Sequence, residues 1–354
     1  MSVKKQLAND SGLIRKRFSL IFTGLIVLLI FSFLLDLFLG SVTIKPLDIV
    51  KALFGNSDDV SGKILMQFRL PKAITALLVG IALSISGLQM QTLFRNPMAG
   101  PYVLGLSSGA SLGVAFVIMG FSSNLSPDAI KGIGNWAMAA SSWTGAGIVM
   151  ILIMIISSRV KNIMTVLILG IMLSSAISSV VSIMQYFSNE TMLKTYIIWT
   201  MGSLGNLTSS QLNVMTISVI IGILISLFSV KMLNAQLLGE EYARSIGLDI
   251  KLSRIVVITG TSILAGTITA FCGPIGFIGI AVPHLARIMF RTSDHKILIP
   301  ATIFTGAIVM LISDIISQMP GSDNVLPINS VTSLIGIPVV IWVILRDQKY
   351  RDIF

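Results

Sequence analysis

The stretch FSLIFTGLIVLLIFSFLLDLFLG, Phe18–Gly40, carries one charged residue, Asp36. A helix needs about 20 apolar residues to cross the hydrocarbon core of a membrane, and this run is long enough. A secretory signal has an apolar region of only about 7–15 residues and a small-residue cleavage site. No A-x-A pattern ends this run, although a basic segment, Met1–Arg17, precedes it. The run therefore predicts an uncleaved first transmembrane helix.

The rest of the chain repeats this pattern. Of 354 residues, 54% are hydrophobic and only 11% are charged, and the mean hydropathy is +0.91. A soluble domain averages about 25% charged residues, so lipid must cover most of this surface. With the first run, the apolar segments predict an all-α protein of about ten transmembrane helices. They are residues 18–40, 71–93, 101–120, 135–157, 163–187, 211–233, 253–271, 274–290, 297–316 and 331–346.

The basic residues indicate the orientation. The net charge is +10, but the lysines and arginines form short clusters between the apolar runs. Such clusters are typical of the cytoplasmic ends of transmembrane helices and not of a nucleic-acid-binding surface. We expect both termini inside and one membrane domain over residues 1–354. Residues 1–17 would form a basic cytoplasmic tail, and residues 234–252 a cytoplasmic loop with a short helix.

The sequence shows no site for covalent chemistry or energy coupling. The pattern G-x-x-x-x-G-K-[ST] is absent, and no nucleophile–base pair or ligand-spaced cluster suggests an enzyme, a metal site or a cofactor. Cys272 reads as a small buried hydrophobe, and His284 as a structural hydrogen-bonding residue. An ion-coupled carrier normally needs carboxylates near the membrane midplane, and none is placed there. Any uphill transport would draw its energy from a partner.

Small polar residues mark one face of the fifth predicted helix at three- and four-residue spacing. They include Ser174, Ser175, Ser178, Ser182 and Gln185. Such residues either allow close helix packing or line a water-filled pathway. The glutamines of the second helix, Gln89 and Gln91, pose the same question. We carry Ser174, Ser175, Ser178, Ser182 and Gln91 forward as candidate pathway residues.

An ordered series of motifs runs from about residue 69 to residue 346. It comprises Arg69-Leu70-Pro71-Lys72, Gly80, Ser86-Gly87, Gln91, Asn96-Pro97-Met98-Ala99, Leu104-Gly105, Gly109-Ala110, Trp199-x-x-Gly202-Ser203, Leu238-Gly239-Glu240, Gly273-Pro274-Ile275-Gly276-Phe277-Ile278-Gly279, Pro283-His284-x-x-Arg287, Asp314 and Gly336-x-Pro338. The series resembles the signature of permease subunits from ATP-driven importers of iron–siderophore and vitamin B12 chelates.

The resemblance implies a ten-helix importer permease of type II that pairs with a second permease subunit, identical or different. It implies an ATP-hydrolysing subunit on each inner face, an extracytoplasmic binding protein that delivers the cargo, and an iron(III)–siderophore complex as the commonest cargo, with haem or cobalamin as alternatives. The inner segment would be a coupling helix on the ATPase; a solvated loop helix is the other reading. The residues of this segment that match the family's coupling helix are Leu238, Gly239, Glu240, Ala243 and Gly247.

On the outer side, the resemblance implies that Arg69 and Lys72 hold acidic groups of the binding protein. The alternative is that they anchor a helix end at the lipid interface. Where the family carries a third docking arginine, a few residues after Asp314, this chain has Gln318. We therefore expect the outer docking surface to differ at this end.

Overall fold

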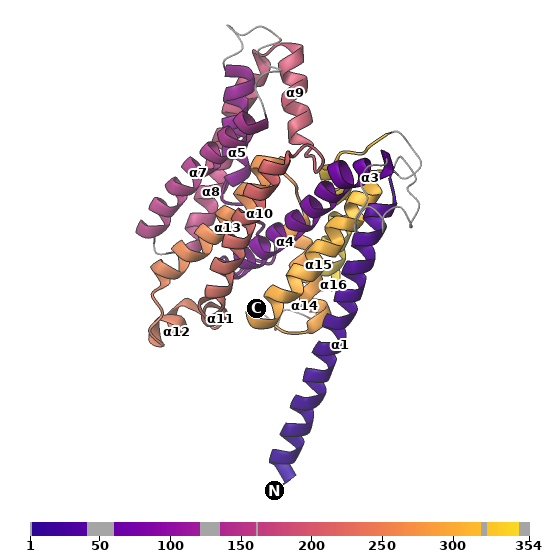
Figure 1. Ribbon diagram of the computed structural model, residues 1–354. Helices are drawn as coiled ribbons and strands as arrows, with labels where there is room; N and C mark the ends of the chain where they lie inside the picture. Colours follow the sequence, from indigo (N-terminus) through magenta and orange to yellow (C-terminus); the bar gives the residue numbers. More distant parts are fainter. Residues whose placement is uncertain (1, 41–59, 121–134, 161, 320–323, 347–354) are drawn as a thin grey trace.

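The computed structural model describes residues 2–40, 60–120, 135–160, 162–319 and 324–346. Within these residues every regular element is a helix, which confirms the all-α prediction. The helices form an elongated bundle (Figure 1). One end holds α9 (Glu190–Thr200) and α3 (Val60–Ile64), and the other holds α11 (Val230–Leu237) and α12 (Glu240–Ser245). We call these the α9 end and the α12 end.

The remaining helices fill the length between the two ends. In chain order they are α1 (Ser2–Phe38), η1 (Leu65–Arg69), α4 (Leu70–Leu93), α5 (Leu106–Ala115), η2 (Phe116–Gly120), α7 (Asn135–Arg159), α8 (Ile163–Tyr186), α10 (Ser209–Phe228), α13 (Ile250–Cys272), α14 (Ile278–Phe290), α15 (His295–Ser317) and α16 (Ile328–Arg346). Among the described residues, seven helices are long and apolar enough to cross a membrane, and three shorter apolar helices accompany them. Together they coincide with the ten predicted segments.

Two predicted boundaries were wrong. The sixth segment was expected to continue to residue 233, but α10 ends at Phe228 and α11 begins at Val230. The Ser229 hydroxyl donates to the Ser226 carbonyl over 2.8 Å, a local bond that competes with the helix pattern. The third segment becomes helical only from Leu106, because Gly105 before it has φ +85°.

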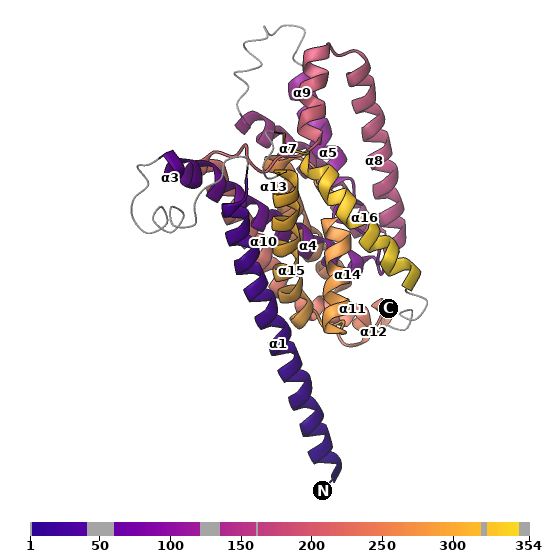
Figure 2. The ribbon, with the colours of Figure 1, turned by 90° about the vertical axis from the view of Figure 1, so that its right-hand side faces the viewer.

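Helix α4 runs through the middle of the bundle (Figure 2). Every residue from Leu78 to Leu93 is buried. The helix packs against α10, α13, α14 and α15. Lipid tails are as apolar as leucine, so burial of apolar surface alone does not hold membrane helices together. Close contact through small side chains has to supply the attraction.

Glycines provide that contact at three helix crossings. A Cβ on Gly80 of α4 would overlap the backbone of Gly306 in α15, and one on Gly87 would overlap that of Gly279 in α14. Between α5 and α7, a Cβ on Gly109 would overlap Gly145. At these points backbone lies against backbone, which maximises dispersion contact and fixes the helix positions.

The chain turns sharply between α13 and α14, as the pair Gly273-Pro274 predicts. Gly273 ends α13 with φ +75°, and a Cβ there would lie 2.5 Å from the Trp199 carbonyl oxygen. Phe277, with φ +65°, precedes α14. The Ser203 amide donates to the Cys272 carbonyl over 2.9 Å, which ties the chain leaving α9 to this turn. The turn thus joins α13 and α14 to the α9 end.

Candidate functional site

At the α12 end, the segment Leu238–Gly247 forms a short helix between two glycines. Gly239 precedes α12 with φ +117° and Gly247 follows it with φ +89°. The Leu248 amide donates to the Ala243 carbonyl over 3.0 Å, which closes the C-terminal end of the helix. The side chain of Ala243 is fully buried. The predicted short helix is therefore present, and it sits on the bundle as a defined unit.

One face of this segment is apolar and uncovered. Leu238, Tyr242 and Ile246 follow one another at four-residue spacing and are 66%, 51% and 57% exposed. Tyr242 and Ile246, four residues apart, lie on the same side of α12, and Leu238 precedes the helix across Gly239. In chain order the three form one exposed apolar row. We call this row the α12 face. An exposed apolar row beside charged residues is typical of a protein contact surface.

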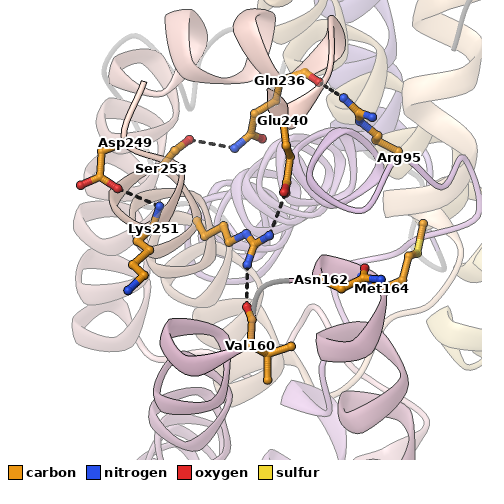
Figure 3. A network of polar contacts seen from close by, with 10 residues as sticks. Arg95, Val160, Asn162, Met164, Gln236, Glu240, Asp249, Lys251 and Ser253 are labelled. Carbon is orange, nitrogen blue, oxygen red and sulfur yellow. Dashed lines mark hydrogen bonds and ion pairs between the residues drawn. The ribbon is translucent and has the colours of Figure 1, made fainter. Parts of the chain in front are cut away.

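Polar contacts hold the α12 segment against the bundle (Figure 3). Arg254 of α13 donates through Nη2 to Glu240 Oε1 over 2.8 Å and through Nη1 to the Val160 carbonyl over 3.0 Å. Gln236 of α11 donates to the Ser253 hydroxyl over 3.0 Å, and its carbonyl accepts from Arg95 over 2.8 Å. The α12 segment, with α11 before it, is therefore tied to the chain that follows α4, to α13 and to the chain that follows α7.

A polar pocket of about 300 Å³ lies between α5, α8 and α9. Its lining consists mostly of hydroxyl and amide side chains. These are Ser107, Ser108, Ser111, Ser178, Ser182, Gln185 and Tyr196, with Val181. Burial raises the pKa of the Tyr196 phenol, opposed by a hydrogen bond with Ser111, so this hydroxyl stays protonated at neutral pH. We call this cavity the serine pocket.

The predicted serines of α8 divide between this pocket and its surroundings. Ser178 and Ser182 line it, while Ser174 and Ser175 lie outside its lining. The hydroxyls of Ser174, Ser175 and Ser182 each donate to the backbone carbonyl four residues earlier in α8, for example Ser182 to Ser178 over 2.9 Å. Their remaining lone pairs can still accept hydrogen bonds. The serine face is thus partly a pocket wall, and a pathway along it stays a prediction.

Gln91 lies inside the bundle and away from the serine pocket. It is fully buried, its Nε2 donates to the Ile280 carbonyl over 3.2 Å, and its Oε1 accepts from Arg287. Its neighbour Gln89 accepts from Thr261 over 3.0 Å on a different side of α4. The structure thus gives Gln91 a role in packing α4 against α14, and its place in a pathway stays a prediction.

The two predicted docking residues, Arg69 and Lys72, both have partners within the chain at the α9 end. Arg69 donates to the carbonyls of Leu37 and Phe38 at the end of α1, over 2.8 and 3.0 Å. Lys72 Nζ lies 2.9 Å from Asp314 Oδ1, and its side chain is 22% exposed. Both residues hold helix ends together here, and anchoring at the lipid interface stays a prediction. A further contact with a binding protein stays a prediction.

Gln318 joins two buried carboxylates at the same end. Its Nε2 donates to Asp314 Oδ2 over 2.9 Å and to Asp36 Oδ1 over 3.1 Å. A neutral amide at this position links α1 to α15 by hydrogen bonds alone. Gln318, which stands where the family carries an arginine, therefore has a structural role: its amide group donates a hydrogen bond to each of the two carboxylates.

Some of these features were missed from the sequence. Ser107, Ser108 and Ser111 of α5 show the same three- and four-residue spacing as the serines of α8, and this signal could have found them. Arg254, one of the basic residues near the ends of the apolar runs, was not singled out from the sequence. Its burial, with 3% of the residue exposed, depends on partners far away in the chain.

Comparison with known proteins gives a consistent result. The family model described as the FecCD transport family matches residues 28–346. A vitamin B12 import system permease protein of Klebsiella pneumoniae is 34% identical over 328 residues, covering 92% of this chain and 93% of the relative. A hemin transport system permease protein of Yersinia pestis is 32% identical over 323 residues, covering 90% and 95%. A solved inward-facing structure described as a metal-chelate type ABC transporter superposes with a TM-score of 0.79 at 27% identity, covering 93% of this chain and 99% of that one.

Proposed function

Because the chain belongs to the FecCD transport family, we propose that it is the membrane-spanning permease of an ATP-driven importer that carries iron(III)–siderophore complexes into the cytoplasm. The observation that carries this proposal is the serine pocket. Hydroxyl and amide groups line it, and no carboxylate, histidine or cysteine does. Such a lining can bind a cargo through hydrogen bonds but cannot replace the ligands of a metal ion. A metal would therefore cross while still held by its chelator.

The two permease relatives suggest other cargoes of the same size class. One is named for vitamin B12 and the other for hemin. Metal-bound siderophores carry many carbonyl and hydroxyl oxygens on their surface, which suits a lining of serines. Haem or cobalamin is the second candidate cargo of this chain. An ion-coupled carrier is the third reading.

The α12 face supplies the contact through which ATP would drive transport. We assign it to a partner ATPase, with Leu238, Gly239, Glu240, Ala243 and Gly247 forming the coupling segment. Four of these residues, all but Leu238, shape and anchor the helix, and the exposed row is left for the partner. A rigid short helix can pass a push from the ATPase to the spans, which then expose the pathway alternately to each side. The chain itself would hydrolyse nothing.

We propose, from the charge pattern, that the α12 end lies in the cytoplasm. The lysine and arginine clusters of the sequence lie mostly in segments assigned to this side, with both termini. We propose a multi-pass protein of the bacterial cytoplasmic membrane, with one domain over residues 1–354, a cytoplasmic tail over 1–17 and the coupling loop at 234–252. Its partners would be membrane lipid, a second permease copy or a different permease, two ATPases and an extracytoplasmic binding protein.

At the α9 end, we propose that Lys72 and Arg69 attract acidic groups of the binding protein while they hold the helix ends. The variant Lys72→Gln can still donate to Asp314 but loses the charge. We expect roughly fivefold weaker capture of the binding protein at low salt, because the lost charge slows association. The difference should shrink at high salt. Titrating labelled binding protein onto the reconstituted complex measures this.

The control for this variant is Lys296→Gln, the same change on an exposed lysine in the first turn of α15, at the α12 end. It should leave capture unchanged. Equal affinities for Lys72→Gln and the parent complex at every salt concentration would confine Lys72 to its structural role.

The test of the proposed function is uptake of a labelled ferric siderophore into vesicles that hold this chain, its ATPase and its binding protein. We expect uptake only when ATP and all three proteins are present. Uptake that follows an ion gradient without ATP would replace the importer with a carrier. ATP-dependent uptake of haem or cobalamin, with none of any ferric siderophore, would retain the importer and change its cargo.

A further inference from the structure

The side chain of Arg254 bridges two parts of the chain that lie far apart in sequence. Its Nη2 contacts Glu240 at the start of α12, and its Nη1 contacts the carbonyl of Val160, which follows the last residue of α7. The guanidinium is almost fully buried, whereas Glu240 is 26% exposed. One rigid, planar group thus holds an edge of the α12 segment and the end of a span.

The Val160 side of this bridge leads to the start of α8, whose other end lines the serine pocket. Asn162 caps α8, because its Oδ1 accepts from the Met164 amide over 2.9 Å. Helix α8 then carries Ser178 and Ser182 to the pocket. Its inner end is therefore held close to the residue that Arg254 contacts. A displacement of α12 would therefore be transmitted to α8 through the side chain of Arg254 and the cap residue Asn162.

The chemistry of arginine is needed for both contacts at once. A guanidinium directs N–H groups along several edges of a plane, so it can serve a carboxylate and a carbonyl simultaneously. A lysine ammonium at the same place would reach one of the two. Burying a charged side chain is costly unless it is paired and hydrogen-bonded. Both partners are present here.

We propose that Arg254 is a positioning residue for energy coupling, which transmits the displacement of α12 to the α7–α8 connection and thereby to the serine pocket. The proposal rests on the proposed function. It distinguishes two routes out of the coupling segment. Gln236 passes force to α13 and α4 through its bonds to Ser253 and Arg95, and Arg254 passes it to α8. Loss of the second route should leave ATP hydrolysis running while transport falters.

The first experiment measures ATP hydrolysed per chelate imported in vesicles that hold the complete importer. Arg254→Lys keeps the charge near Glu240 and loses the second contact. We expect this ratio to rise about fivefold or more, with ATPase subunits still bound at parental stoichiometry. The matched control is Arg159→Lys, the same change on an exposed arginine adjacent to Val160, which should leave the ratio unaltered.

A double-mutant cycle tests whether Glu240 and Arg254 act together. Glu240→Gln alone should raise the same ratio, and combining it with Arg254→Lys should add little, because both changes break one path. Should the lysine variant fail to assemble, the glutamine variant carries the test by itself. The inference would be overturned if the two substitutions had additive effects on the ratio of ATP hydrolysed to chelate imported. It would also be overturned if an assembled variant kept the parental ratio.

The second measurement follows the pocket itself. Cys272 is the chain's single cysteine and is buried, so a Ser178→Cys variant gives a probe with low background. We expect ATP to change the rate at which an impermeant maleimide labels this probe, and Arg254→Lys to abolish that change. If the parental complex showed no ATP-dependent uptake, the proposed function itself would be overturned. Parental uptake with an unaltered labelling response in the lysine variant would overturn this inference alone.

Discussion

Leucine in place of Gly87 is expected to leave almost no correctly folded protein in the membrane. A Cβ at this position would overlap the backbone of Gly279 in α14, so the obstacle cannot rotate away as a side chain would. Overpacking against flexible side chains costs about 1–3 kcal/mol, and displacing backbone should cost at least the upper end of that range. Thermal unfolding in detergent and the yield of monodisperse protein measure the loss.

The matched control is Gly24→Leu. A Cβ on Gly24 of α1 meets no atom within 4 Å, and the residue is exposed on the helix surface. Leucine is also a better helix former than glycine, so this variant should unfold at or above the parental temperature. If Gly87→Leu unfolded like the control, α4 and α14 would have to lie farther apart than the structure places them.

The contrast between these glycines shows what the sequence predicts about this fold. All ten apolar segments coincide with helices because a run of apolar residues has to become a helix to satisfy its backbone in lipid. Composition does not tell which helix lies in the centre. Gly24 and Gly87 both lie within apolar runs, but only Gly87 meets a neighbouring backbone, and that neighbour lies nearly two hundred residues away. The break at Ser229 was missed for a related reason, because apolar residues continue on both sides of it.

The site was predictable to a different degree at each end. The glycine-bounded segment at 238–247 forms a helix as expected, because glycines favour helix ends and the residues between them form helices readily. The serine face of α8 was visible as a periodicity, yet its opposite wall in α5 was not recognised. Arg69 and Lys72 were noted for their charge, and their partners, the end of α1 and Asp314, depend on how distant helices pack.

The second large effect concerns the α12 face. Tyr242→Asp is expected to release the ATPase and to abolish ATP-driven uptake. The side chain is 51% exposed at the centre of the apolar row, so the change should not disturb the fold. In a contact with a partner, however, it would bury a charge without a counter-ion. Truncation of a central aromatic residue in an interface typically costs 2 kcal/mol or more, which is roughly a 30-fold loss of affinity.

Three measurements separate this outcome from simple damage to the protein. The unfolding temperature of the isolated permease should equal that of the parent, because Ala243 and Glu240 still anchor α12. Tyr242→Phe retains the ring and loses only the hydroxyl, so it should keep both the ATPase and uptake. Co-purification of the ATPase with the aspartate variant at parental stoichiometry would show that the row is not the contact surface. Because Arg254→Lys should uncouple a complex that stays assembled and Tyr242→Asp should disassemble it, the pair distinguishes contact with the ATPase from transmission beyond it.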